Sequence, residues 1–283
     1  LVGLSMSSEA APKPAKIKPI IFTAMGCGPY NADAEVALTR FIRVENQVGT
    51  SAFMVHCGDI VTGKIKNWPE SQYAKVAGIL RDGNRIPTFV VPGDNEWNDL
   101  DDPARGWRFW TKHFLKFDEQ WKFPEPVKRQ PERTENFAFV NNHVVFIGIN
   151  KVGGRIHDKD EWNARHADNA RWIDANLQAS KTRVHSAVIF AQATAAGRQT
   201  TMVAPFKQAA ERFGKPILYL HADGHKWFVI EKEWATNITH VQMDLISSNF
   251  PPLQVTVTGD PKTPFKFDRR QNSPVWGTVK KLP

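Results

Sequence analysis

Short apolar runs that alternate with segments of helical periodicity constrain the fold of this chain more than any other sequence feature. Three such runs in the first half are expected as strands, and three periodic segments are expected as helices. In chain order they are a strand at 17–24, a helix from 32 to about 44, a strand at 51–56, a helix over 70–81, a strand at 87–91 and a helix over 104–117. Strands separated by helices are typical of parallel sheets, so this half predicts an α/β fold.

The second half mixes hairpins with the same alternation. After a proline-rich connection it has a hairpin, two helices, two apolar strands and a closing group of strands. The connection covers 123–133, the hairpin 137–140 and 144–147, the helices 159–179 and 204–213, the strands 187–190 and 217–220, and the closing strands 226–257. We therefore expect an α/β protein with two mixed sheets sandwiched between helices.

The pattern gives no domain boundary inside 17–259. Residues 1–16 read either as a flexible lead-in or as the remnant of a signal peptide, because an apolar stretch precedes a small-residue cleavage pattern. On the second interpretation the protein is secreted or periplasmic. Residues 260–283 are expected to be an irregular basic tail. We expect no membrane span, because the chain lacks a run of about eighteen apolar residues.

The positive charge of the chain lies mostly at its two ends. The formal net charge is +8, with 37 Lys and Arg against 29 Asp and Glu. Residues 1–20 hold three Lys and one Glu, and residues 260–283 hold six basic and two acidic side chains, so the body carries only +2. Because no aromatic side chains interleave with the basic ones, we expect no nucleic-acid partner.

Polar side chains gather where the predicted strands end, which is where α/β sheets place their ligand-binding groups. Asp59, Asp94 and Asp223 offer hard oxygen atoms and His225 an imidazole, a set that suits one or two divalent cations such as Zn, Fe or Mn. Asp59 and Asp94 each follow a glycine, which lets the backbone turn sharply. The same two residues also fit a helix cap or a turn, and both interpretations stay open.

These loops, in this order, resemble those of the calcineurin-like metallophosphoesterases. The resemblance covers about 20–245 and is greatest to a branch with the motifs GDxPY, GDNEW and HGDxH. The matching segments are GCGPY at 26–30, GDNEW at 93–97 and HADGH at 221–225. The resemblance implies a four-layer αββα sandwich and a phosphoesterase that attacks a small phosphorylated substrate with metal-activated water.

The same resemblance implies roles for single residues. Asp59 takes the place of the carboxylate that bridges two metals, Asp94 that of a ligand Asn, and Asn95 that of the His that serves as acid. Asp223 and His225 take the places of two ligand histidines. With Asn95 at the acid position, His56 and His221 are the remaining candidates for a proton donor.

Two departures bear on activity. Cys27 stands where the family has a metal-ligating Asp, and it ligates only as a thiolate, which favours Zn over Mn or Mg. Gln192 stands where the family has a ligand His and offers a neutral amide instead. The alternative function is therefore a pseudoenzyme of the same fold that has lost one or both metals and binds a ligand or a protein partner, or forms part of an assembly. His56 and His221 also fit ordinary structural roles.

The two cysteines, Cys27 and Cys57, follow neighbouring predicted strands. They can form a disulfide in an exported protein, or remain free with Cys57 buried and Cys27 beside the cleft. Aromatic side chains of the helix over 104–117 are expected in the core, and Trp97 is expected to line the substrate cleft.

Overall fold

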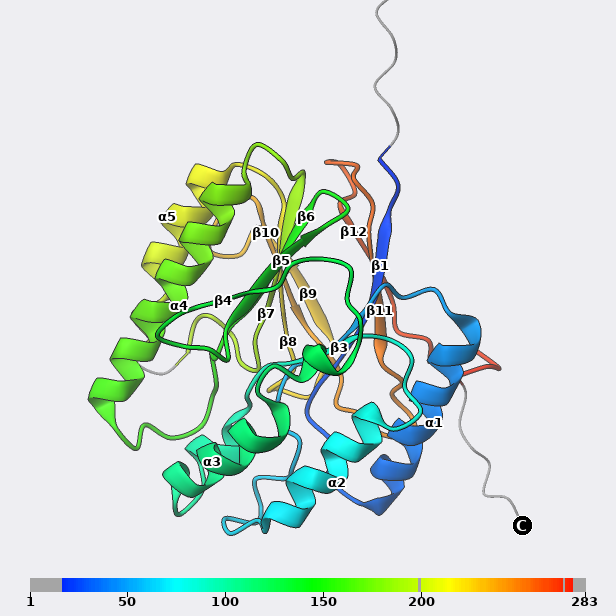
Figure 1. Cartoon of the computed structure of the whole chain (residues 1–283). Helices are drawn as coiled ribbons and strands as arrows, with labels where there is room; N and C mark the ends of the chain where they lie inside the picture. Colours follow the sequence, from blue (N-terminus) through cyan, green and yellow to red (C-terminus); the bar gives the residue numbers. More distant parts are fainter. Residues whose placement is uncertain (1–16, 198–199, 272, 277–283) are drawn as a thin grey trace, which may run out of the picture.

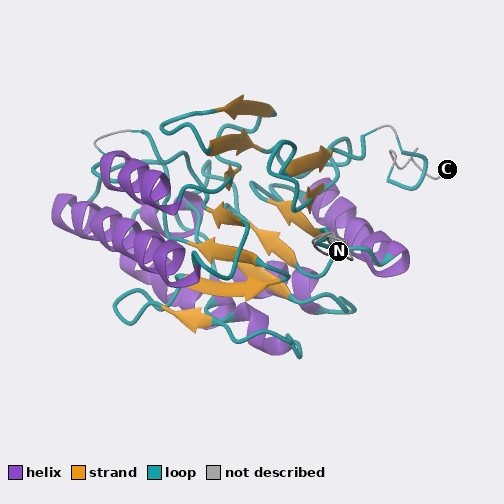
Figure 2. Cartoon of the chain, turned by 90° about the horizontal axis from the view of Figure 1, so that it is seen from above, coloured by secondary structure: helices purple, strands orange, loops and turns teal. Residues whose placement is uncertain are grey.

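Two mixed β-sheets face each other and carry helices on their outer sides (Figures 1 and 2). The structure, a computed structural model, describes residues 17–197, 200–271 and 273–276. The elements are β1 (Ile20–Met25), α1 (Ala32–Val48), β2 (Met54–His56), α2 (Glu70–Arg81), β3 (Thr88–Val90), η1 (Asp94–Asn98), α3 (Pro103–Phe114), η2 (Phe117–Gln120), β4 (Lys128–Arg129), β5 (Phe137–Asn141), β6 (Val144–Gly148), α4 (Lys159–Ser180), β7 (Ser186–Phe190), α5 (Val203–Phe213), β8 (Ile217–His221), β9 (Phe228–Glu231), β10 (Ile238–Gln242), β11 (Leu253–Val257) and β12 (Phe265–Asp268).

The five-stranded sheet has the order β12-β11-β1-β2-β3, and the seven-stranded sheet has the order β4-β5-β6-β7-β8-β10-β9. β1, β2 and β3 run parallel, as do β6, β7, β8 and β10, and the added strands β11, β12, β5 and β9 run antiparallel to their neighbours. The parallel strands of each sheet end at a common edge. That edge is where the polar loops meet.

Three apolar layers hold the arrangement together. Aromatic side chains fill the space between the sheets, where the rings of Phe53 and Phe146 lie 4.9 Å apart and those of Phe22 and Phe53 lie 5.1 Å apart. A second layer joins α4 and α5 to the seven-stranded sheet, and a third joins α1, α2 and α3 to the five-stranded sheet. In Figure 1, α4 and α5 lie to the left of the sheets, α1 lies to the lower right, and α2 and α3 lie below. The expected αββα sandwich is confirmed.

The C-terminal segment differs from the prediction. Residues 265–268 form β12 and pair with β11, whereas the sequence predicted an irregular tail from 260 onward. In this strand half-buried Phe265 and Phe267 alternate with exposed Lys266 and Asp268. The many charged residues of the segment made this alternation hard to recognise in the sequence. The expected lead-in at 1–16 lies outside the described residues. Among the residues described, no helix combines the length and apolarity needed to cross a bilayer.

Candidate metal centre

The loops that follow β1, β2, β3, β7 and β8 converge and bring together two overlapping sets of ligand atoms. The first set, which we call the carboxylate trio, is Asp59, Asp94 and Asp223; the second, the mixed set, is Cys27, Asp59 and His225. Within each set the ligand atoms lie within 4.8 Å of one another. Asp59 belongs to both sets, and the bridging role that the resemblance implied for it stays a prediction.

Two glycines allow the loops after β2 and β3 to touch backbone to backbone. A Cβ added at Gly58, whose φ is +75°, would lie 2.6 Å from the Cα of Gly93. A Cβ added at Gly93 would lie 2.0 Å from the backbone nitrogen of Asp59. Neither position has room for a side chain. The Gly-Asp pairs therefore place Asp59 and Asp94 side by side.

Gln192, fully buried, lies at the centre of the carboxylate trio. Its Nε2 atom donates to Asp59 Oδ2 at 3.3 Å, to Asp94 Oδ1 at 3.3 Å and to Asp223 Oδ1 at 3.0 Å. Its Oε1 atom accepts from the backbone N–H of Gly153 at 2.8 Å, which fixes the orientation of the amide. The structure thus turns the oxygen expected to ligate a metal away from the trio.

The mixed set is held by hydrogen bonds to Asp59. The Cys27 thiol donates to Asp59 Oδ2 at 3.5 Å, and burial together with the nearby Asp59 charge raises the pKa of this thiol well above its usual value. The Tyr30 hydroxyl donates to the same oxygen at 3.0 Å and lies 3.4 Å from His225 Nε2. Asn95 Nδ2 in turn donates to the Tyr30 hydroxyl at 3.4 Å. Sequence reasoning missed Tyr30, although it ends the GCGPY motif.

Glu96 is a second site residue that sequence reasoning missed. Its fully buried carboxylate accepts from the backbone N–H of Gly93 at 2.5 Å and from that of Asp59 at 3.2 Å. Burial, with the Asp94 charge nearby, raises the pKa of Glu96 to about 8. Burial and the Glu96 charge raise the pKa of Asp59 to about 7, and burial raises that of Asp94. The site therefore concentrates negative charge that a cation would stabilise.

The donor chemistry separates the two sets. Three converging carboxylates in a buried setting fit a hard divalent cation, provided that the Gln192 amide makes room for it. In the mixed set the protonated Cys27 does not fit a hard cation, because a thiol must ionise before it ligates. The chain is thus suited to one cation at the carboxylate trio more than to two.

Both histidines considered as proton donors lie outside these sets. His56 is buried behind the loop after β1, where its Nε2 atom lies 2.7 Å from the carbonyl oxygen of Gly28, and burial lowers its pKa to about 4. His221 Nε2 lies 2.8 Å from His240 Nε2, and His240 Nδ1 lies 3.1 Å from a carboxylate oxygen of Glu233. Within the described chain, neither His56 nor His221 hydrogen-bonds a member of the carboxylate trio. Both cysteines are free and buried, so no disulfide joins them.

A pocket of about 480 Å³ adjoins the carboxylate trio through Asp223. It is lined by Lys151, Val152, Gly153, Trp162 and Ala193 among others. Trp97, which was expected at the substrate cleft, lines a different pocket of about 430 Å³ together with Trp107. The carboxylate trio and the pocket of about 480 Å³ therefore form the candidate site.

Stability should depend on pH in a way that reports the buried carboxyls. The carboxyl groups of Asp59 and Glu96 bind protons more tightly in the folded protein than in the unfolded one. Their contribution to stability is therefore lost as the pH rises through their folded pKa values, about 7 for Asp59 and about 8 for Glu96. Buried His56 and His221, with lowered pKa values, oppose this trend, mainly below their unfolded pKa of 6.5. We expect metal-free protein to lose about 1 kcal/mol of stability between about pH 6.5 and pH 7.5.

Thermal melting of chelator-treated protein across that pH range measures this loss. Added Mn²⁺ should raise the melting temperature more at the higher pH, where the carboxylates are ionised and free to bind it. A melting temperature that rises with pH in metal-free protein would contradict the raised pKa values.

No protein-family model matches the sequence, and no curated protein matches it. Solved structures resemble the fold at low identity. A dimetal phosphatase from Danio rerio has a TM-score of 0.58 at 10% identity, over 89% of this chain and 98% of its own. GAP50, described as the anchor in the inner membrane complex of Plasmodium, has a TM-score of 0.52 at 10% identity, over 89% and 88%.

A 5'-nucleotidase from Candida albicans has a TM-score of 0.51 at 12% identity, over 89% of this chain and 51% of its own. This chain therefore spans about half the length of that nucleotidase. At such identities the likeness concerns the fold.

Proposed function

The chain has the fold of the calcineurin-like metallophosphoesterases, and on that premise we propose that it is a metal-dependent phosphoesterase. The observation that carries the proposal is the carboxylate trio, which brings together the oxygen donors of buried Asp59 and Asp94 and of half-buried Asp223 beside a pocket of about 480 Å³. Asp59, Asp94 and Asp223 would hold one divalent cation, most favourably Mn or Fe. When bound, such a cation lowers the pKa of a water molecule and polarises a phosphoryl oxygen.

The protein groups around the trio have defined tasks in this proposal. Tyr30 and the backbone N–H of Asn95 both donate to Asp59, at 3.0 Å and 3.3 Å, and so orient its two oxygens. The Glu96 carboxylate accepts hydrogen bonds from the backbone N–H groups of Gly93 and Asp59 and so fixes the backbone at these loops. Because the Asn95 side chain cannot release a proton as an acid does, substrates whose leaving group departs as a stable anion, such as aryl phosphates, are favoured.

Metal content and turnover measured on one preparation test the proposal. We expect elemental mass spectrometry to find about one equivalent of a transition metal, and the protein to hydrolyse p-nitrophenyl phosphate. Chelation should abolish hydrolysis, and added Mn²⁺ or Fe²⁺ should restore it. Protein that binds neither Mn, Fe nor Zn, and turns nothing over in their presence, would end the enzyme proposal.

A specific observation favours a second candidate function, that of a non-catalytic binding protein. Gln192 and Cys27 already donate hydrogen bonds to the carboxylates, so neutral groups partly satisfy the site without a cation. GAP50, whose description names it an anchor, has a similar fold. Metal-free protein that is fully folded and inactive would favour this candidate over the phosphoesterase.

A further inference from the structure

Lys151 is a buried ammonium group without a matching negative partner. Its side chain is enclosed, with 2% of the residue exposed, and its Nζ atom donates to the carbonyl oxygen of Val152 at 3.1 Å. Within the described chain that is its one hydrogen bond, and no carboxylate lies within 4.0 Å of it. The ring of Trp162 lies beneath it, with Nζ 5.6 Å from the ring centroid. An ammonium with three donors and one acceptor has the capacity to bind an anion.

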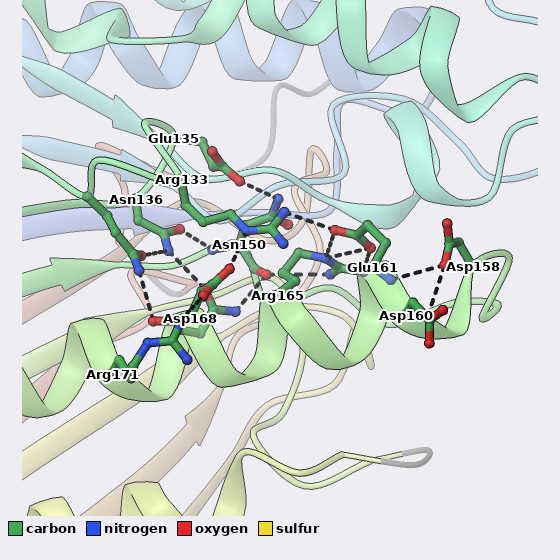
Figure 3. Close-up of polar contacts among 12 residues, drawn as sticks. Arg133, Glu135, Asn136, Asn150, Asp158, Asp160, Glu161, Arg165, Asp168 and Arg171 are labelled. Carbon is green, nitrogen blue, oxygen red and sulfur yellow. Dashed lines mark hydrogen bonds and ion pairs between the residues drawn. The ribbon is translucent and has the colours of Figure 1, made fainter.

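The backbone that carries Lys151 is firmly held. The neighbouring Asn150 donates through its backbone N–H to Asn136 Oδ1 at 2.7 Å, and its carbonyl oxygen accepts from Asn169 Nδ2 at 2.8 Å. Arg165, fixed by Glu161, lies against the same carbonyl. Figure 3 shows this network running along α4 to Asn150. Lys151 is therefore positioned by a rigid support rather than by a mobile loop.

Lys151 shares a pocket with Asp223, one member of the carboxylate trio. The pocket of about 480 Å³ is lined by both Lys151 and Asp223. Gly153 lets this loop approach the trio, because a Cβ there would lie 3.0 Å from Oδ2 of both Asp94 and Asp223. Burial and the nearby Arg165 charge lower the pKa of Lys151 to about 8, and the Asp223 and Asp94 charges oppose this shift without forming an ion pair with the ammonium. One ligand in this pocket can thus reach the ammonium and the Asp223 end of the trio together.

We propose that Lys151 binds the phosphoryl group of the substrate, and that the substrate is a small phosphate monoester. The inference rests on the proposed function for its reaction, although phosphate binding itself needs no turnover. A monoester carries two negative charges near neutral pH, which suits one ammonium and one divalent cation better than the single charge of a diester does. The pocket is lined by both apolar and polar side chains, and its volume suits a small molecule.

Titration calorimetry with inorganic phosphate, on Mn²⁺-loaded protein, tests the binding step. We expect Lys151→Met to weaken phosphate binding by about tenfold or more, since hydrogen bonds to a charged group contribute about 1.5–3 kcal/mol. Lys159→Met, at an exposed lysine on the first turn of α4, is the matched control and should bind phosphate as the unchanged protein does. Circular dichroism melting confirms folding, and Lys151→Gln serves as a second variant if the Met variant is unfolded.

Kinetics separate this inference from the proposed function. With p-nitrophenyl phosphate, Lys151→Met should raise KM more than it lowers kcat. The same substitution should lower kcat/KM less for a diester than for the monoester. If the unchanged protein binds phosphate but hydrolyses nothing, and Lys151→Met loses that binding, the inference is supported and the phosphoesterase proposal is overturned. If the unchanged protein hydrolyses substrate and Lys151→Met binds phosphate as tightly as it does, the inference is overturned. The inference is also overturned if the unchanged protein does not bind phosphate.

Discussion

Asp94→Asn should abolish metal-dependent hydrolysis and, at the same time, make the metal-free protein more stable. Asp94 contributes one of the three oxygens of the carboxylate trio, and loss of even an outer partner of a metal ligand costs about 10–100-fold in metal affinity. We therefore expect Mn²⁺ affinity and turnover of an aryl phosphate to fall by about 100-fold or more. The Asn side chain keeps an acceptor for the Gln192 amide, so the buried hydrogen bond survives.

The stability gain follows from electrostatics. Burial and the neighbouring Asp59 charge raise the pKa of Asp94, which means that its ionised form costs free energy in the folded protein. Removing that charge should raise the melting temperature of chelated protein by roughly 2–4 °C, the effect of about 1 kcal/mol in a domain of this size. Asp101→Asn, which neutralises an exposed carboxylate, should change neither activity nor melting temperature. Unchanged metal affinity in Asp94→Asn would remove the trio as the metal site.

Cys27→Asp should strengthen metal binding and increase turnover. The substitution puts a carboxylate beside Asp59 and His225 and turns the mixed set into one that fits a hard cation. Cys27 has a φ of 54°, a backbone conformation that Asp tolerates better than most residues. We expect Mn²⁺ affinity to rise by about tenfold or more, and the metal content to move from one equivalent toward two.

The same substitution should cost stability when no metal is present. It adds a carboxyl group to a fully buried position next to Asp59, so the chelated variant should melt below the unchanged protein. Cys27→Ser, which removes the thiol without adding a charge, is the control and should gain no metal affinity. If Cys27→Ser and Cys27→Asp gain alike, the thiol itself obstructs binding, and the explanation from ligand hardness is wrong.

The sequence predicted two mixed sheets between helices because its strands are short and apolar and alternate with segments of helical periodicity, and the resemblance implied the αββα arrangement. It failed at residues 265–268, where a half-buried edge strand has a charged outer face and resembles a tail in composition. Strands of this kind are specified by the neighbour they pair with, here β11, and a single segment carries little sign of that pairing.

The candidate site was predictable as a set of residues and less so in its orientation. Asp59 and Asp94 each follow a glycine at a strand end, so their meeting could be expected from the sequence. The direction of the Gln192 amide could not, because it depends on the backbone N–H of Gly153, thirty-nine positions away. The sequence did not predict a role for Glu96, because its side chain accepts a hydrogen bond from the backbone N–H of Gly93, a contact that its place in the motif does not indicate.

The position of β1 inside its sheet has a consequence for biosynthesis. β1 lies between β2 and β11, and Ile20 pairs with Val257, so one edge of β1 stays unpaired until residues far along the chain have been translated. Until then that edge exposes unpaired backbone groups, which readily pair with other chains. A nascent or truncated chain that ends before residue 253 should therefore depend on chaperones to stay unaggregated, whereas the finished chain covers the edge itself.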